Sequence, residues 1–480
     1  MSSWRKFPTV YEINTWVWIA ALSKKSGCRV TLRDIPSSEI DRLASLGCDA
    51  IWLMGVWERS AEARKLATEI AFLHTEYKKA LPDVTTADIV GSPYSIHAYK
   101  VDEFLGGDEG LNFFRAELTR VGLKLILDFV PNHIAIDHRW VNEHPEFLLA
   151  GSETELQKEP QNYFACKENN QKIFAYGRAN YCGAWTDTVQ LDYRKEKTRQ
   201  AMLDELLSVA TRCDGIRCDM AMLLVPDVFT ACWAGQFEGA NQEFWLQAIS
   251  ETKNKHPGFL FMAEVYWDLE FHLQQQGFDY TYDKRLYDRL NEGNVSAVQA
   301  HLTGKWDFQS RLVRFIENHD EQRACSAFGA RKSLAAATAS LTLPGMRLFH
   351  DGQLEGLSSK VPVQLGRRKD EPPDASIFNF YKKLLSALSH PIFHEGSWQL
   401  LDPQAARPGE DSHKYILAHQ WEHNGDFRLV VVNLCNTNVE IPAFKSNCEM
   451  HDLLSGKKFN EPTLSLSAFG CHILEPVATK

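Results

Sequence analysis

The stretch Leu125-Ile-Leu-Asp-Phe-Val-Pro-Asn-His133 places an acidic residue, an asparagine and a histidine at the end of an apolar, strand-like run. Three later stretches also end an apolar run in an acidic residue: Gly215-Ile-Arg-Cys-Asp219, Phe261-Met-Ala-Glu264 and Phe315-Ile-Glu-Asn-His-Asp320. A barrel of eight parallel strands presents its catalytic groups where the strands end, on one rim. The four stretches therefore predict an α/β fold, a (β/α)8 barrel with acidic side chains on that rim.

Eight apolar runs are expected to form the strands of the barrel. They alternate with segments that fit helices, which is the pattern of a parallel sheet with crossover helices. Two of these helices are predicted over Ser37–Leu46, where the serines supply an N-cap, and over Lys195–Cys213. The expected strands are Val10–Ile19, Asp49–Val56, Leu123–Val130, Gly215–Met220, Phe259–Val265, Tyr280–Tyr282, Leu312–Ile316 and Met346–Phe349.

Two regions interrupt or follow this alternation. Residues 134–190 are rich in Asn, Gly, Tyr and Trp without clear periodicity, and an excursion of this length in a compact domain is usually functional. We expect them to form an inserted subdomain after the third strand, between the barrel segments 1–133 and 191–390. Residues 391–480 change to short alternating strands such as Arg428–Asn433 and Ser465–Leu474, which predict a C-terminal antiparallel β-sandwich domain.

Composition and charge narrow the class of protein. The 480 residues are 44% hydrophobic and 24% charged, so apolar material for a large core is ample. The formal net charge of −10 argues against nucleic-acid and anionic-membrane partners, which require a concentrated basic face. No run reaches about 18 apolar residues, so no membrane-spanning helix is expected. A neutral substrate is favoured, and the oligomeric state is left open.

The N-terminus and the cysteines indicate a cytoplasmic protein. Residues 1–8 lack the apolar core and the cleavage site of a secretion signal. The eleven cysteines are scattered without the paired spacing of a zinc site, and several lie inside apolar strands, where a free thiol behaves as a small hydrophobe. We therefore expect free thiols and a reducing compartment.

The four stretches together resemble the sequence regions of glycoside hydrolase family 13, the α-amylase family, whose members carry them in this order. The resemblance implies a retaining α-glucoside hydrolase that acts on α-1,4-glucan or malto-oligosaccharides through a covalent glucosyl-enzyme intermediate. It covers the barrel and is compatible with the C-terminal β domain. The residues that match the four regions are Asp128, Asn132 and His133; Gly215 to Asp219; Glu264; and Asn318, His319 and Asp320.

Cleavage of an acetal needs two carboxyl groups that do opposite work at one pH. Asp219 follows Arg217 by two residues, and a neighbouring cation should lower the pKa of its carboxyl, which suits a nucleophile. Glu264 ends an apolar run and precedes Val-Tyr-Trp, and desolvation there should raise its pKa, which suits a general acid/base. The two carboxyls are expected to lie about 5 to 5.5 Å apart.

The resemblance also assigns roles around the sugar. Asp320 is the third catalytic carboxylate, which would hold the 2- and 3-hydroxyls of the sugar, while His133, His319 and Arg217 would bind substrate in the same subsite. Tyr94 matches the aromatic platform beneath the sugar. Asp128 and Asn318 would not touch the sugar. Asp128 would orient Arg217, and Asn318 would fix the loop backbone.

The sequence departs from the family pattern on two sides of the expected cleft. The residue after Tyr94 is acidic in one glucosidase pattern and is Ser95 here, and Ala98 occupies another acidic place. Many α-amylases have Lys-His three and four positions after the nucleophile, where this chain has Met222 and Leu223. Linkage, chain-length preference and endo or exo attack are therefore left open.

A calcium site is the other point of departure. The family often offers Gln-Pro-Asp before the segment Leu191-Asp-Tyr-Arg194, but here those places hold Thr188, Val189 and Gln190. Asn132 remains one candidate ligand, whereas calcium binds six to eight oxygens, several of them from carboxylates. No cofactor is expected to be required, and a structural calcium ion is left as an alternative.

Three other functions compete with hydrolysis. A transglucosidase of the same family would use the same site with a sugar as acceptor. A non-catalytic relative would keep the barrel, but such proteins usually lose a catalytic acid and this chain keeps all three. A metal-dependent hydrolase would need clustered His and carboxylate ligands, and only His133 and His319 lie at expected strand ends.

Overall fold

A closed barrel of eight parallel strands forms the centre of the protein. The computed structural model describes residues 4–166, 169–179, 183–233, 243–444 and 449–477. The barrel order is β1-β14-β13-β12-β11-β10-β5-β2, so each strand lies beside the barrel strands that precede and follow it in the chain. The predicted fold class is confirmed. The strands are β1 (Thr9–Asn14), β2 (Ala50–Met54), β5 (Lys124–Phe129), β10 (Gly215–Cys218), β11 (Leu260–Ala263), β12 (Tyr280–Tyr282), β13 (Leu312–Arg314) and β14 (Met346–His350).

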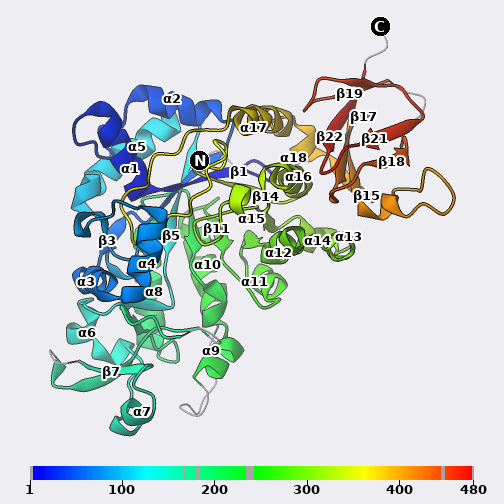
Figure 1. Cartoon of the computed structure of the whole chain (residues 1–480). Helices are drawn as coiled ribbons and strands as arrows, with labels where there is room; N and C mark the ends of the chain where they lie inside the picture. Colours follow the sequence, from blue (N-terminus) through cyan, green and yellow to red (C-terminus); the bar gives the residue numbers. More distant parts are fainter. Residues whose placement is uncertain (1–3, 167–168, 180–182, 234–242, 445–448, 478–480) are drawn as a thin grey trace.

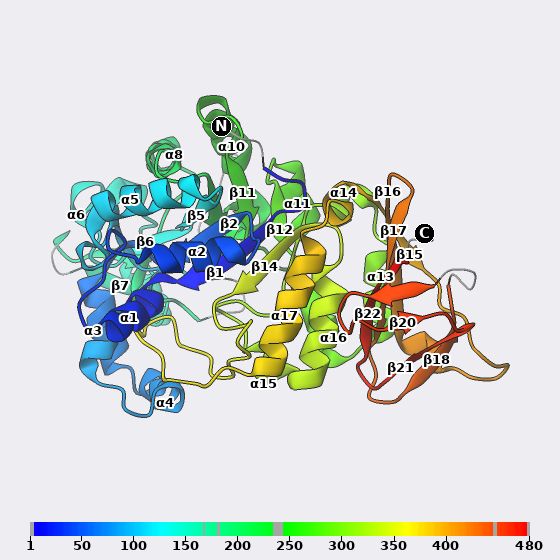
Figure 2. The same ribbon diagram turned by 90° about the horizontal axis from the view of Figure 1, so that it is seen from above.

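Helices surround the barrel (Figures 1 and 2). A helix that covers a barrel needs one apolar face. In helix α8 (Glu196–Ala210), the buried residues Met202, Leu206 and Val209 recur at helical spacing and form such a face. The other helices outside the excursions described below are α1 (Thr15–Ser26), α2 (Ser37–Ser45), α5 (Gly107–Arg120), α9 (Pro226–Cys232), α10 (Phe244–Lys255), α11 (Glu270–Gln275), α12 (Lys284–Glu292), α13 (Val295–Leu302), α14 (Trp306–Gln309), α15 (Ala324–Ala327), α16 (Ala330–Leu341), α17 (Ala375–Leu388) and α18 (Ile392–Glu395).

Two local predictions at the first strand and the second helix are wrong. The run Val10–Ile19 is not one strand, because β1 ends at Asn14 and α1 begins at the next residue. The Asn14 side chain accepts a hydrogen bond from the N–H of Val17 at 3.3 Å, which caps the helix. At α2, Pro36 occupies the N-cap position and no side chain caps the helix, so the serines do not play the predicted role.

The chain leaves the barrel twice for longer excursions. After β2, the antiparallel pair β3 (Trp57–Arg59) and β4 (Ile96–Val101) encloses α3 (Ala61–Glu69) and α4 (Ala71–Ala80). After β5, the strands β6 (His133–Ala135) and β9 (Thr188–Gln190) pair with each other. Between them lie α6 (Trp140–Glu143), α7 (Glu153–Lys158) and the pair β7 (Tyr163–Cys166) and β8 (Lys172–Ala175). This second excursion lies at the lower left of Figure 1.

The C-terminal region consists of antiparallel strands beside the barrel (Figures 1 and 2). A six-stranded sheet has the order β15-β16-β17-β22-β19-β20, and β18 pairs with β21 in a second sheet. Val431 of the first sheet and Val439 of the second belong to one buried cluster, so the two sheets share a core. The strands are β15 (Ser397–Leu401), β16 (Ile416–His423), β17 (Asp426–Asn433), β18 (Val439–Pro442), β19 (Met450–Asp452), β20 (Lys458–Phe459), β21 (Thr463–Leu466) and β22 (Cys471–Pro476).

The predicted strand Ser465–Leu474 is split into two. β21 ends at Leu466 and β22 begins at Cys471, and the two strands belong to different sheets. Between them Phe469 has a φ of +53°, in the left-handed region, which breaks the extended conformation.

The structure also bears on the membrane and cysteine predictions. In the ranges that are described, no helix has both the length and the apolar character to cross a bilayer. The nine cysteines within those ranges are free thiols. Cys182 and Cys448 lie outside the described residues.

Candidate active site

A buried arginine at the end of β10 lies at the centre of the site. Arg217 is 0% exposed, and its Nη1 lies 2.8 Å from Asp219 Oδ1 and 3.7 Å from Asp128 Oδ1. Its Nη2 lies 2.7 Å from Glu264 Oε2 and 3.9 Å from Asp320 Oδ2. The three carboxyls predicted to be catalytic, although distant in the chain, therefore converge on one guanidinium together with Asp128.

The register of the parallel strands produces this convergence. Arg217 on β10 is level with Asp128 on β5. Asp219 directly follows β10, and Glu264 directly follows β11. The N–H of Glu264 donates to the carbonyl of Cys218 at 3.0 Å, which holds the ends of the two strands together. Carboxyls that follow neighbouring parallel strands are thereby brought to the same rim.

Glu264 is surrounded by hydrogen-bond donors. The N–H of Met220 donates to its Oε2 at 2.8 Å, and the Tyr266 hydroxyl donates to its Oε1 at 2.7 Å. Arg217 forms the ion pair described above. Met220 has a φ of +42°, in the left-handed region, so the backbone turns sharply at the residue after the expected nucleophile. The expectation that Glu264 has apolar surroundings is wrong: its side chain is buried, but among polar groups.

The pKa of Asp219 moves in the direction opposite to the one predicted. Burial raises this pKa, as do the negative charges of Glu264 and Asp320, and the lowering effect of Arg217 does not outweigh them. Arg217, the cation near Asp219 in the sequence, is only one of the groups that act on this carboxyl. Because Arg217 is shared among several carboxyls, its charge does not compensate each of them in full.

Asp320 and His319 form a second charged group at the site. His319 Nε2 lies 3.0 Å from Asp320 Oδ2, and its Nδ1 bonds a carboxyl oxygen of Glu12 on β1. Burial lowers the pKa of His319, but Asp320 and Glu12 outweigh it and raise that pKa to about 10. Asp320 is partly desolvated, yet His319 and Arg217 lower the pKa of its carboxyl well below the usual range. Asp320 is therefore ionised beside an imidazolium.

Tyr94 lies against the charged centre of the site. Its ring stacks on His319 with centroids 5.5 Å apart, and the Arg217 guanidinium lies 5.2 Å from its ring centroid. Its hydroxyl oxygen is 2.6 Å from His319 Nε2. The Nε2 of His133 bonds the Tyr94 carbonyl at 3.2 Å, and burial lowers the pKa of His133 to about 4, so this ring is neutral. His133 thus contacts the segment that carries Tyr94.

The backbone N–H of Gly55 holds the carboxyl of Asp128 in place. The N–H of Gly55 donates to its Oδ2 at 3.1 Å, and burial raises the pKa of Asp128 to about 6, against the lowering effect of Arg217. Gly55 has a φ of +79°, and a Cβ there would lie 2.9 Å from both Arg59 Nη2 and Pro93 Cβ. Only glycine fits this position.

The Asn318 side chain holds the backbone of its own loop. Asn318 Oδ1 accepts hydrogen bonds at 2.9 Å from the N–H groups of Asp320 and Glu321.

Met222 and Leu223, which replace the Lys-His of many α-amylases, lie in a short 3₁₀ turn and are 0% and 1% exposed. They pack in the core.

The side chain of Asn132, the one candidate calcium ligand in the sequence, pairs with another amide. The Asn132 side-chain oxygen accepts a hydrogen bond from Gln190 Nε2 at 3.0 Å, so another amide already uses it. Over the residues that the structure describes, no three His, Cys, Asp or Glu side chains are grouped so that they could hold a metal ion.

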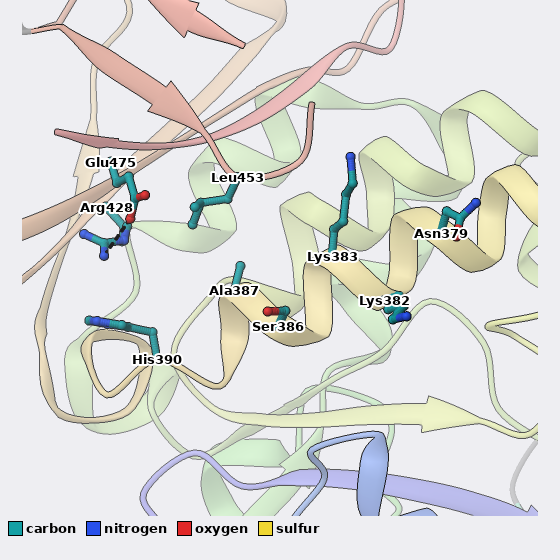
Figure 3. Close-up of a pocket in the computed structure, with 9 residues that line it drawn as sticks. All are labelled: Asn379, Lys382, Lys383, Ser386, Ala387, His390, Arg428, Leu453 and Glu475. Atoms are coloured by element: carbon teal, nitrogen blue, oxygen red, sulfur yellow. Dashed lines mark ion pairs between the residues drawn. The ribbon is translucent and has the colours of Figure 1, made fainter. Parts of the chain in front are cut away.

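The site opens at Asp320, whose side chain is 41% exposed. A cavity of about 570 Å³ reaches Asp320 and His319 and is bounded by α4 and the loop after β14, including Lys360. Lys360 donates to the Asp320 carbonyl. A second cavity, of about 630 Å³, lies between α17 and the C-terminal strands (Figure 3). Its lining includes Lys383, His390 and Arg428, and it shares no lining residue with the carboxylate cluster.

Sequence reasoning missed two residues of this site, Glu12 and Tyr266. Glu12 is 0% exposed in the middle of β1. The signal was an acidic residue inside the apolar run Val10-Tyr-Glu-Ile13, which indicates a paired carboxylate because unpaired buried charge is costly. Tyr266 was counted only as part of apolar surroundings.

Comparisons with known proteins identify the family of this chain. The family model described as "Alpha amylase, catalytic domain" matches residues 32–371. The chain is 24% identical to α-amylase MalA of Haloarcula japonica over 485 residues, which cover 95% of this chain and 59% of that protein. It is 21% identical to α-amylase 3 of Dictyoglomus thermophilum, over 75% of this chain and 66% of that protein. The chain thus spans about three-fifths to two-thirds of the length of these curated relatives.

Solved structures share the fold over almost the whole chain. A noncanonic maltogenic α-amylase AmyB from Thermotoga neapolitana superposes with a TM-score of 0.69 at 19% identity, covering 99% of both chains. An α-amylase from Lactobacillus plantarum gives a TM-score of 0.70 at 19% identity, covering 98% of this chain and 99% of that chain. With a family model that matches more than half of its length, this chain belongs to the α-amylase family, glycoside hydrolase family 13.

Proposed function

We propose that the protein is a retaining α-glucoside hydrolase that acts on α-1,4-glucan or malto-oligosaccharides. The observation that carries this proposal is the contact of one buried guanidinium, Arg217, with both Asp219 and Glu264, and its proximity to Asp320. Two carboxyls beside one reacting bond are what retaining hydrolysis needs. Family membership favours an α-glucoside as the substrate.

In the first step, an oxygen of Asp219 attacks the anomeric carbon while Glu264 gives its proton to the departing glycosidic oxygen. This forms a glucosyl ester on Asp219 and releases the rest of the chain. In the second step, Glu264 takes a proton from water, whose oxygen attacks the anomeric carbon and frees Asp219. Asp320, ionised beside His319, accepts hydrogen bonds from the sugar hydroxyls in both steps.

The carboxyls at the site lie close together. Asp219 and Glu264 contact the same guanidinium, and burial with the nearby negative charges raises the pKa of Asp219, so this carboxyl keeps a proton to higher pH than an ordinary aspartate. Asp219 must lose that proton before it can attack the anomeric carbon.

The product and its anomeric form test this proposal. Maltose, maltotriose, isomaltose, sucrose, trehalose and soluble starch would each be incubated with the protein, and the products separated and followed by proton NMR. We expect cleavage of the maltose series and starch, with the α-anomer released first. Initial release of the β-anomer would overturn the retaining mechanism. Products longer than the substrate would instead identify a transglucosidase. Inactivity of the folded protein on all six substrates would contradict the proposal.

A further inference from the structure

A buried glutamate on β1 lies behind the sugar-binding face. Glu12 is 0% exposed, and one of its carboxyl oxygens bonds Nδ1 of His319. Among the described residues, its other oxygen, Oε2, has no hydrogen-bond partner. A buried carboxylate with only one partner depends strongly on that partner for compensation, because burial of an unpaired charge is costly.

The second nitrogen of the same ring faces a second carboxylate. His319 Nε2 lies 3.0 Å from Asp320 Oδ2 and 2.6 Å from the Tyr94 hydroxyl oxygen. A neutral imidazole has one N–H and one lone pair, so it would point a lone pair at either Glu12 or Asp320. Only the doubly protonated ring donates to both carboxylates.

Other groups around the ring limit its freedom. The Trp52 ring meets it edge-on with centroids 5.5 Å apart, and Tyr94 stacks on it. Besides Glu12 and Asp320, the charged groups near the ring include Asp128 and Arg217. Further charged residues line a small cavity together with His319: Glu321, Arg323, Asp351, Arg368 and Lys360, which also bonds the Asp320 carbonyl. The two carboxylates in contact with the ring nitrogens therefore decide its orientation and its charge.

We propose that Glu12 is a positioning residue, which holds His319 doubly protonated with its Nε2–H directed at Asp320 and the sugar. Nδ1 is then occupied, and Nε2 can only donate a hydrogen bond. The imidazolium keeps Asp320 ionised as an acceptor for sugar hydroxyls. The catalytic relevance of this arrangement rests on the proposed glycosidase function, whereas the protonation state can be measured without it.

The test is nitrogen-15 NMR of the full-length protein with labelled histidine. The His319 signals are identified as those lost in His319→Gln. In the wild-type protein at pH 8 we expect both ring nitrogens of His319 to be protonated. In Glu12→Gln, the amide oxygen still accepts from Nδ1 but carries no charge, so the titration of His319 should move to lower pH by at least about one unit. A singly protonated His319 in the wild type, or an unchanged titration in Glu12→Gln, would overturn the proposal.

A second buried glutamate–histidine pair provides the matched control. Glu317 is 1% exposed, and its Oε1 lies 3.2 Å from His350 Nδ1 and 2.6 Å from Arg323 Nη1. Glu317→Gln removes a buried charge of the same kind, and we expect it to leave the titration of His319 in place. A shift as large as that in Glu12→Gln would mean that any buried charge loss disturbs the site, and would contradict a specific role for Glu12.

Measurements of kcat/KM against pH relate the charge of His319 to the proposed hydrolase activity. If the protein is the proposed hydrolase, kcat/KM of Glu12→Gln should approach the wild-type value at low pH and fall to about one tenth of it above the lowered pKa of His319. An equal loss at every pH would indicate general damage and contradict the proposal. If Glu12→Gln does not fold, the wild-type spectrum decides alone, because a neutral His319 at pH 8 overturns the proposal. If no substrate is cleaved, the proposed function fails while the NMR result stands.

Discussion

Two buried arginines on the barrel strands have opposite electrostatic surroundings. Arg217 on β10 faces Asp219, Glu264, Asp128 and Asp320, so one cation is shared by four carboxyls. Burial and the neighbouring carboxyls raise the pKa of Asp219. This cluster is short of positive charge, so Asp219 keeps its proton to higher pH than an ordinary aspartate does.

The cluster around Arg314 at the end of β13 is balanced. Arg314 pairs with Asp283, which also lies 2.9 Å from His301 Nε2. Its remaining nitrogens donate to the Pro344 carbonyl and to the carbonyl and side chain of Gln309. Burial acts to raise the pKa of Asp283, but Arg314 lowers it below the ordinary value. Removal of one partner from a buried ion pair of this kind is costly, because it leaves the other charge buried and uncompensated.

A carboxyl is not catalytic merely because it lies at a strand end. Asp219 directly follows β10 and Asp283 directly follows β12, so their positions in the barrel are equivalent. Because the charge balance around the two carboxyls differs, we predict that Asp219 takes part in the reaction and that Asp283 stabilises the fold.

The largest expected effect is the loss of activity in Asp219→Asn. Without the nucleophile, kcat/KM on maltotriose should fall by about 10⁴-fold. The free energy of unfolding should not fall, because the substitution removes a negative charge from an overloaded site. Enzyme assays and urea denaturation of the same preparation check both expectations. Substantial remaining activity would remove the nucleophile assignment and with it the contrast between the clusters.

Asp283→Asn should lower the stability of the protein and leave its activity nearly unchanged. It leaves Arg314 buried without its carboxylate, and the free energy of unfolding should fall by about 3–5 kcal/mol. Activity per folded molecule should stay close to that of the wild type at a temperature where the variant is folded. If Asp283→Asn instead lost activity without losing stability, the two clusters would not differ as proposed.

The pH dependence of stability should separate the clusters further. The pKa of Asp219 is raised above its ordinary value of 3.8, so its contribution to stability is full below that pH and is lost as pH rises through the higher folded-state pKa. The wild type should therefore lose more than about 1 kcal/mol relative to Asp219→Asn between pH 4 and 8. The folded-state pKa of Asp283 is lowered, so its contribution is present above its ordinary value and disappears on acidification. Urea denaturation between pH 4 and 8 gives the first slope, and extending it below pH 3.8 gives the second. Parallel curves for wild type and Asp219→Asn between pH 4 and 8 would contradict the first.

The smallest expected effect concerns the acid/base side. Tyr266→Phe removes the hydroxyl that donates to Glu264 Oε1 at 2.7 Å. One such hydrogen bond contributes about 0.5–1.5 kcal/mol, so kcat/KM should change by roughly two- to tenfold, mainly through kcat. Tyr287→Phe is a suitable control, because this tyrosine packs against Phe315 and Phe328, outside the carboxylate cluster. Equal effects of the two substitutions would remove the role given to Tyr266.

Much of the fold could be predicted because its signals are local. The apolar runs of the eight barrel strands and the helical spacing of α8 are visible in the sequence, and each fixes an element by itself. Failures occurred where a single side chain or backbone angle decides the outcome. Asn14 ends β1 by capping a helix, and Phe469 interrupts the predicted strand Ser465–Leu474.

The acidic residues at strand ends could be found from the order of residues alone, and the strand order then brings Asp219, Glu264 and Asp320 together. Their charge environment depends on the folded protein, because a pKa depends on every group within a few ångströms, however distant in the chain. Arg217 is two residues from Asp219 in sequence yet is shared with Glu264, and Glu12 bonds His319 across 307 residues. Covalent neighbours are fixed by the order of the chain, whereas electrostatic neighbours exist only after the barrel has closed.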